Sequence, residues 1–215
     1  MDVLIEQRGV IWDGFQTTLA LLAVSGVLAL VLGTVLAAMR VSPIRALNAF
    51  GTAYIFVFRN TPLLVILIFT AFGLPALDVR PSFFMKAVIA LSVYTAAFVC
   101  EALRSGINAV NPGQAEAARS VGMTFGQTLS IVVLPQAFRT VIAPLASVFI
   151  ALAKNTSLAQ GFGIAEATFR MKGLINNNPG DVYLIFFGIA LGYVLIVAVI
   201  SGAANIAERQ LSVRR

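Results

Sequence analysis

One polar stretch decides how the rest of the chain is interpreted. From Asn111 to Pro135 it reads NPGQAEAARSVGMTFGQTLSIVVLP. Asn111 is a good N-cap residue, Pro112 suits the first helical position, and Gln114 stands where a capping-box partner would. Gly122 is suited to the left-handed residue that ends a helix. The first half of this stretch therefore predicts a short, well-capped helix.

The second half predicts another helix and so completes a helical hairpin. Thr124 and Gln127 have the spacing of a second N-cap and capping box, and the helix is expected to end before Pro135. Three alanines (Ala115, Ala117 and Ala118) give the first helix a smooth surface that a partner can approach closely. The pattern favours a docking element, and the alternative is a loop that only joins two flanking segments.

The segments around the hairpin are those of a membrane protein. The chain is 59% hydrophobic and 11% charged, against about 25% charged in soluble domains. Its apolar runs are long enough to span a bilayer, and they are continuous, not alternating as in barrel strands. We expect an all-α membrane protein with one transmembrane domain over 1–215. The predicted spans are 15–39, 50–77, 82–106, 136–157 and 182–207, and the hairpin belongs to a polar loop at 108–135 between the third and fourth spans.

The distribution of Lys and Arg predicts the orientation. With five spans and an outer N-terminus, inner segments hold 8 of these residues, including Arg214 and Arg215, and outer segments hold 6. Arg59 is left within the membrane. Positive charge favours the inner side, so the N-terminus is expected outside and the C-terminus and hairpin in the cytoplasm. The net charge of +6 is thus attributed to topology and not to nucleic-acid binding.

Ionisable residues within spans indicate a functional site, because a charge is costly there. Arg59 lies about 13 Å into the second span, at 1.5 Å per residue, and Lys154 closes the fourth. Both cations would attract carboxylates. Alternatives remain open: Arg59 pairing with Glu101, Lys154 reaching the outer surface, and Asn155–Ser157 capping a helix. The candidate substrate-path residues are Arg59, Asn60, Thr61, Lys154, Asn155, Thr156 and Ser157.

Several motifs together resemble a known family. EAARSVG at 116–122, followed by IVVLP at 131–135, resembles the EAA loop of importer permeases in the ATP-binding-cassette superfamily. RNTPLL at 59–64, the stretch 94–107 and KNTSL at 154–158 are similar to motifs of its polar amino acid permeases. Within that group the spelling looks most like the glutamate-uptake permeases of actinobacteria.

This resemblance implies a type I importer transmembrane domain in a bacterial inner membrane, for glutamate or a related polar amino acid. It implies a cytoplasmic ATPase dimer that binds ATP and Mg, an extracytoplasmic binding protein and a second permease subunit. The likeness to glutamate systems favours a second permease that differs from this chain, and the alternative is an identical one. No cofactor is then expected in this chain. The residues implied to contact the ATPase are Glu116, Ala117, Ala118, Arg119 and Gly122.

The sequence indicates a transport component and not an enzyme. It has no phosphate-loop motif, no histidine, and a single cysteine, Cys100, so neither a catalytic triad nor a transition-metal site is expected. The alternative function is a gradient-driven transporter or channel, which would favour a longer chain with internal repeats. The outer stretch 166–181 is polar enough to face the binding protein, and the alternative is an ordinary loop.

Overall fold

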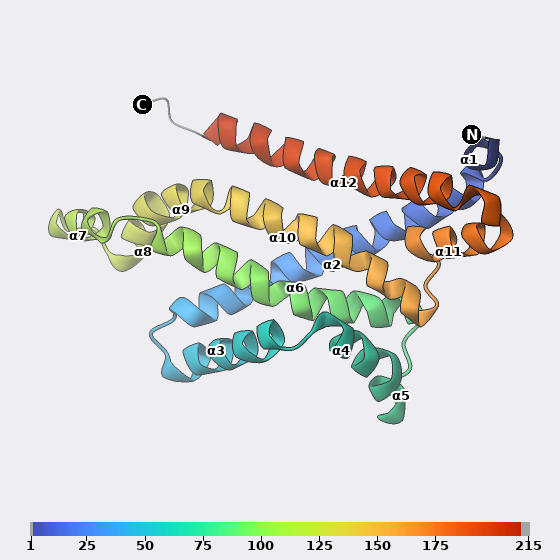
Figure 1. Ribbon diagram of the computed structural model, residues 1–215. Coiled ribbons are helices and arrows are strands. Elements are labelled where there is room, and N and C mark those ends of the chain that lie inside the picture. The colour runs from blue at the N-terminus through green and yellow to red at the C-terminus, as the bar shows by residue number, and fades with distance from the viewer. Residues whose placement is uncertain (1, 212–215) are drawn as a thin grey trace.

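The long apolar runs form long helices in the structure, a computed structural model that describes residues 2–211. Packed along one another lie α2 (Arg8–Val41), α6 (Phe83–Asn108), α10 (Ile142–Asn155) and α12 (Val182–Leu211) (Figure 1). At 1.5 Å per residue, the 34 residues of α2 extend about 51 Å, more than the ~30 Å of a bilayer core. The ends of this helix therefore reach beyond the hydrocarbon.

Four helical segments are long and apolar enough to cross a membrane, and a bent pair of helices makes a fifth candidate. The four are Arg8–Val41, Phe83–Asn108, Ile142–Phe162 and Pro179–Gln210. The prediction of an all-α membrane fold with about five spans is confirmed. Arg214 and Arg215, which were counted toward the orientation, lie outside the described residues.

The predicted second span, 50–77, is not one continuous helix. α3 (Arg45–Asn60) ends just before Thr61, and a second helical segment starts with α4 (Leu63–Ile68). The chain bends by 99° between the two segments. Thr61 is extended, with φ −97° and ψ 127°, because Pro62 disfavours a helical conformation in the residue before it. A proline therefore breaks this span and frees backbone groups in the middle of the molecule.

Two stretches of wide, π-type helix each end just before a proline. η1 (Phe69–Gly73) precedes Pro75, and η2 (Thr128–Val133) precedes Pro135. Proline lacks an N–H and its ring clashes with the carbonyl four residues earlier, and a wider turn relieves both conflicts locally. The prediction that the hairpin's second helix ends before Pro135 is wrong, because the chain stays helical through α9 (Leu134–Thr140).

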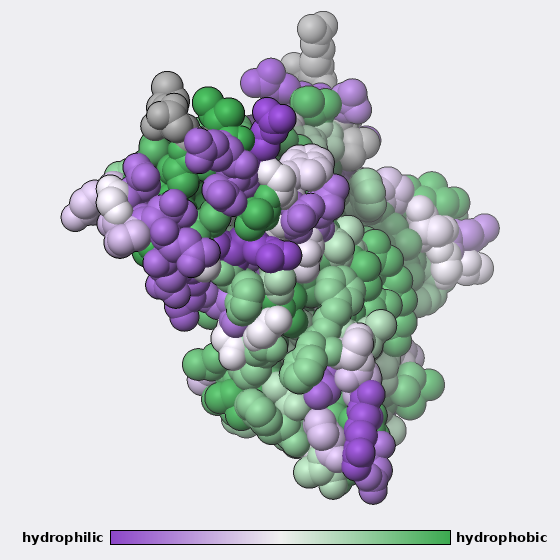
Figure 2. Space-filling model, turned by 90° about the vertical axis from the view of Figure 1, so that its right-hand side faces the viewer, coloured by the Kyte–Doolittle hydropathy of each residue, from purple (hydrophilic) through white to green (hydrophobic). Residues whose placement is uncertain are grey.

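Shorter elements gather at the two ends of the long helices. α7 (Pro112–Ser120) and α8 (Phe125–Gln127) project at one end (Figure 1). At the other end lie α1 (Asp2–Glu6), α5 (Leu74–Ala76), η3 (Thr156–Phe162), α11 (Ala167–Asn177) and η4 (Pro179–Asp181). The stretch 166–181 is thus largely helix, so the alternative of an ordinary loop is wrong. Figure 2 views this end and shows hydrophilic areas separated by hydrophobic ones.

The core lies where α2 packs on α6, and small residues allow the close approach. A Cβ atom at Gly33 would lie 2.6 Å from the Cβ of Val99 and 2.9 Å from the carbonyl oxygen of Ala96. No side chain fits there without moving the α6 backbone. Leu36 and Cys100 are almost fully buried beside this contact. Against this pair of helices pack α3, α4 and α10.

Candidate functional site

The hairpin has the local caps that its sequence predicts. The Asn111 side chain accepts a hydrogen bond from the Gly113 N–H at 2.9 Å. Thr124 and Gln127 form a reciprocal capping box, with distances of 2.9 and 3.3 Å. Gly122 has a φ of +89°, the left-handed region that favours glycine. These interactions confirm the predicted helix starts and the glycine stop between them.

One predicted contact in the hairpin is different. Gln114 does not close a capping box; its Oε1 accepts from Gln136 Nε2 at 2.7 Å, which joins the two limbs. Gln136 also donates to the carbonyl of Val132 at 2.8 Å. Ala118 is 7% exposed, and α7 packs against η2. The limbs are therefore held together, and Ala118 faces the inside of the hairpin.

The outer surface of the hairpin combines charge with exposed apolar groups. Glu116, Ala117 and Arg119 are exposed, as is Gly122. Sequence reasoning missed Val121 and Phe125, which are 79% and 69% exposed beyond the glycine turn. The signal was available, since both are large apolar residues at the polar tip of a capped hairpin. An exposed apolar patch with a polar rim is typical of a docking surface.

Arg59 lies in a cluster of charges drawn from three helices. Glu101 of α6 forms ion pairs with Arg40 of α2, with Arg59 of α3 at 3.4 Å, and with Arg104 of α6 at 3.4 Å. The Arg59–Glu101 pair is the one that the sequence left open as an alternative. What the sequence did not reveal is that three guanidinium groups share a single carboxylate.

A cavity of about 460 Å³ opens beside this cluster, and Arg59 and Asn60 line it. The Asn60 amide donates to the carbonyl of Phe56 at 2.7 Å, and the Thr61 hydroxyl donates to that of Val57 at 2.8 Å. Both side chains thus form hydrogen bonds to the preceding turn of α3, next to the helix break. Arg59 is the charged residue of α3 in the lining of this cavity.

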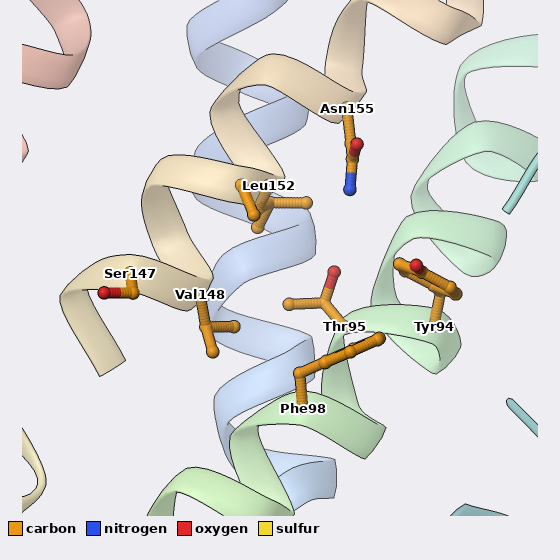
Figure 3. Close-up of a pocket in the computed structure, with 8 residues that line it drawn as sticks. Tyr94, Thr95, Phe98, Ser147, Val148, Leu152 and Asn155 are labelled. Atoms are coloured by element: carbon orange, nitrogen blue, oxygen red, sulfur yellow. The ribbon is translucent and has the colours of Figure 1, made fainter. Parts of the chain in front are cut away.

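A second cavity, of about 230 Å³, lies between α6 and α10 (Figure 3). Asn155 of α10 and Thr95 of α6 point toward one another across it, and Phe98 and Tyr94 close its α6 side. Phe98 also lines the first cavity, the one beside Arg59. The carbon Cζ of Arg59 lies 5.7 Å from the centre of the Phe98 ring. One aromatic ring therefore borders both cavities.

The polar residues predicted at the end of the fourth span do not act as one cluster. Asn155 faces α6, whereas Lys154 and Ser157 line a third cavity of about 220 Å³, beside Tyr193 of α12. Thr156 is fully buried and donates to the carbonyl of Ala153 at 2.7 Å. Consecutive residues of a helix point about 100° apart, so neighbours in this stretch serve different surfaces.

A buried acid that sequence reasoning did not single out lies at the start of α11. The Glu166 side chain is fully buried and accepts from the Phe169 and Thr168 N–H groups at 2.7 and 2.9 Å. The Tyr193 hydroxyl donates to it at 2.7 Å. Burial raises the pKa of the Glu166 carboxyl, and these hydrogen bonds oppose that shift. The acid ties α11 to α12.

The fold and the site together define a helical membrane transport protein. Its helices border cavities whose linings include charged and polar side chains, and a capped hairpin projects at one end. The family model for the inner membrane component of binding-protein-dependent transport systems matches residues 29–213. The chain belongs to this family.

Individual relatives agree with the family match. The chain is 40% identical to the glutamate transport system permease protein GluC of Corynebacterium glutamicum, covering 91% of each chain. It is 35% identical to the probable glutamine ABC transporter permease protein GlnM of Bacillus subtilis, covering 98% of this chain and 97% of that one.

A solved amino acid ABC transporter with histidines superposes with a TM-score of 0.89 at 30% identity, over 96% of each chain. The predicted resemblance to importer permeases, and the type I fold that it implied, are thereby confirmed.

Proposed function

We propose that this chain is the permease subunit of an ATP-driven importer for glutamate or a related polar amino acid. The observation that carries the proposal is the capped hairpin with an exposed apolar tip, attached to a helical membrane domain of the importer family. The names of the relatives support an amino acid as the substrate. The cavities lined by Arg59, Asn155 and Lys154 support a solute that carries carboxylates.

The hairpin docks on a separate ATPase subunit in this proposal. Val121 and Phe125 enter an apolar groove, Glu116 and Arg119 make polar contacts at its rim, and Ala117 permits close approach. The partner binds ATP and Mg, and closure of its dimer moves the hairpin as a lever. Because η2 and α9 continue into α10, the motion reaches the helix that carries Asn155. The spans then change between two packings.

The remaining parts of the assembly follow from the two ends of the molecule. The hairpin and C-terminus face the cytoplasm, and the end that carries α11 faces the outside, where a binding protein delivers the substrate. A second permease, different from this chain in keeping with its resemblance to glutamate systems, completes the path. Exposed apolar side chains along α12, such as Val194, Leu195 and Val199, face this partner or lipid.

The test is to purify the chain from its own cells and identify what accompanies it. We expect a phosphate-loop ATPase in the complex, and uptake of radiolabelled glutamate into vesicles only when ATP is supplied inside for that ATPase. Competing amino acids then define the substrate. Uptake that persists without the ATPase and follows an ion gradient would overturn the proposal in favour of a secondary transporter.

A variant of Gly122 tests the coupling role itself. Left-handed backbone costs a non-glycine residue about 1–2 kcal/mol, so Gly122→Val distorts the turn between the two limbs. We expect ATP hydrolysis to continue while uptake per ATP falls at least about tenfold. Gly126→Ala is the matched control, because Gly126 lies within a helical segment of the same hairpin with open space around it. Normal coupling in Gly122→Val would remove this glycine from the mechanism.

A further inference from the structure

The ion cluster around Glu101 carries more positive charge than its partners balance. Arg40, Arg59 and Arg104 share one carboxylate, which leaves a formal excess of two positive charges. Elsewhere in the described residues, a side-chain ion pair joins Asp78 and Arg80. Excess charge in or near a bilayer is costly unless a counter-charge is present. The cluster therefore favours an anion that the chain does not itself provide.

The space for such an anion lies next to the cluster. The cavity of about 460 Å³ falls within the usual range of small-molecule sites, about 300–1,000 Å³. Arg40 is only 14% exposed, whereas Arg59 is 44% exposed. Arg59 is therefore the guanidinium that can turn toward a ligand, while Arg40 stays with Glu101. Thr52 and Asn60 add uncharged polar groups to the same wall.

The position of the cavity favours a transported solute over a lipid headgroup. Phe98 lines both this cavity and the one between α6 and α10. A solute that leaves Asn155 and Thr95 in the latter therefore meets Phe98, and the Arg59 guanidinium carbon lies 5.7 Å from the centre of that ring. The break between α3 and α4 follows directly after Asn60, so the helix end beside the cavity can move without bending a continuous helix.

We infer that the cavity formed by Arg40, Arg59 and Glu101 is an acceptor site for acidic amino acids, in which Glu101 competes with the substrate for Arg59. An acidic amino acid carries a net negative charge, whereas its amide is a zwitterion without net charge. The excess positive charge thus favours glutamate over glutamine. Glu101 keeps the empty site partly neutralised, and it weakens binding enough for release. This inference rests on the proposed function and names the property that selects its substrate.

The experiment measures selectivity in the whole importer, reconstituted with its ATPase, partner permease and binding protein in vesicles. The KM values for glutamate and glutamine are determined for the wild type, Arg59→Gln, Arg59→Lys and Glu101→Gln. We expect Arg59→Gln to raise the glutamate-to-glutamine KM ratio at least tenfold and Arg59→Lys to raise it less. Glu101→Gln lowers the same ratio severalfold, because the internal competitor loses its charge.

Arg80→Gln is the matched control, since Arg80 pairs with Asp78 at 3.1 Å in an exposed outer turn, and its ratio should equal that of the wild type. A ratio changed less than twofold by Arg59→Gln would overturn the inference. It would also be overturned if Arg59→Gln altered only the dependence of ATP hydrolysis on phosphatidylglycerol, which would indicate a lipid phosphate. Should Glu101→Gln fail to assemble, the two Arg59 variants still decide the matter.

Failure of the inference is distinguishable from failure of the proposed function. A wild-type complex that imports no amino acid with ATP contradicts the proposed function. A wild-type complex that imports glutamate, but whose selectivity ignores Arg59 and Glu101, contradicts only the acceptor site. Import restricted to neutral amino acids also contradicts the acceptor site and leaves an amino acid importer standing.

Discussion

Glu166 is a carboxylate buried outside the spanning helices, at the first turn of α11. Its partners are the N–H groups of Thr168 and Phe169 and the hydroxyl of Tyr193. These donors suit an ionised acid at a helix N-terminus, but complete burial penalises the charge and raises the pKa of the Glu166 carboxyl. Glu166 thus holds α11 against α12, but the burial of its charged form lowers the free energy of unfolding.

This balance predicts a pH dependence of stability. Because the native carboxyl holds its proton more tightly than the unfolded one, its contribution is greatest below the ordinary value of 4.5 and is lost as the pH rises through the raised native pKa. From neutral pH toward 4.5, the melting temperature of the wild type should therefore rise relative to Glu166→Gln. In a chain of this size each kcal/mol shifts the melting temperature by about 2–4 °C.

Thermal unfolding of the purified protein in detergent measures this difference. Glu116→Gln serves as the control, because it removes an exposed carboxyl from the hairpin and should leave the pH profile of the wild type unchanged. A constant difference between wild type and Glu166→Gln across that pH range would contradict the role of the buried charge.

At the scale of elements, the π-type turn η2 sets the direction in which the hairpin projects from α10. Pro135 prevents an α-helical hydrogen bond at its own position, and the wide turn before it absorbs the conflict. Since α9 and α10 follow with only Val141 between them, the hairpin and the cavity-lining helix form one lever. The angle of that lever depends on whether the wide turn is kept.

Pro135→Ala should close η2 into ordinary α-helix. A π-type turn holds one residue more than an α-helical turn, so its closure rotates the preceding segment by about 100° about the helix axis. The exposed tip would then no longer match the groove of the proposed ATPase partner. We expect unchanged helix content by circular dichroism and uptake per ATP reduced at least about tenfold. Pro75→Ala, after η1 at the opposite end, is the control and should keep normal coupling. Normal coupling in both variants would indicate that η2 has no part in the alignment.

At the scale of the whole molecule, the two ends differ in what they present. One end carries the hairpin, and the other carries α1, α5 and α11 (Figure 1). In the proposed orientation the hairpin end lies in the cytoplasm, because Lys and Arg favour that side. Cys100 is the sole cysteine of the chain and is buried, so single reporter thiols can be placed at either end in a Cys100→Ala background.

This arrangement predicts which side each reporter labels. With a membrane-impermeant thiol reagent, Arg80→Cys should react in intact cells, and Arg119→Cys should react only in inside-out vesicles. Both side chains lie in exposed positions, so in a permease expressed without its ATPase partner a lack of access would reflect the membrane and not burial. The opposite labelling pattern would reverse the proposed orientation and place the hairpin away from any cytoplasmic ATPase.

The sequence by itself determined whatever depends on composition or on neighbours within one helical turn. Continuous apolar runs required a helical membrane protein. The caps at Asn111 and Thr124 and the stop at Gly122 were predicted because each acts through hydrogen bonds to residues two or three positions away or through its own φ. The motifs identified the family for the same reason, since they are contiguous in the chain.

Only the tertiary structure decided which distant side chains meet. Arg40, Arg59 and Glu101 come from three helices, and their convergence depends on how α2, α3 and α6 pack. Adjacent residues were separated for a related reason: a turn of 100° per residue sends Asn155 toward α6 and Lys154 toward α12. Pro135 misled the prediction because a wider helical turn satisfied the backbone without ending the helix.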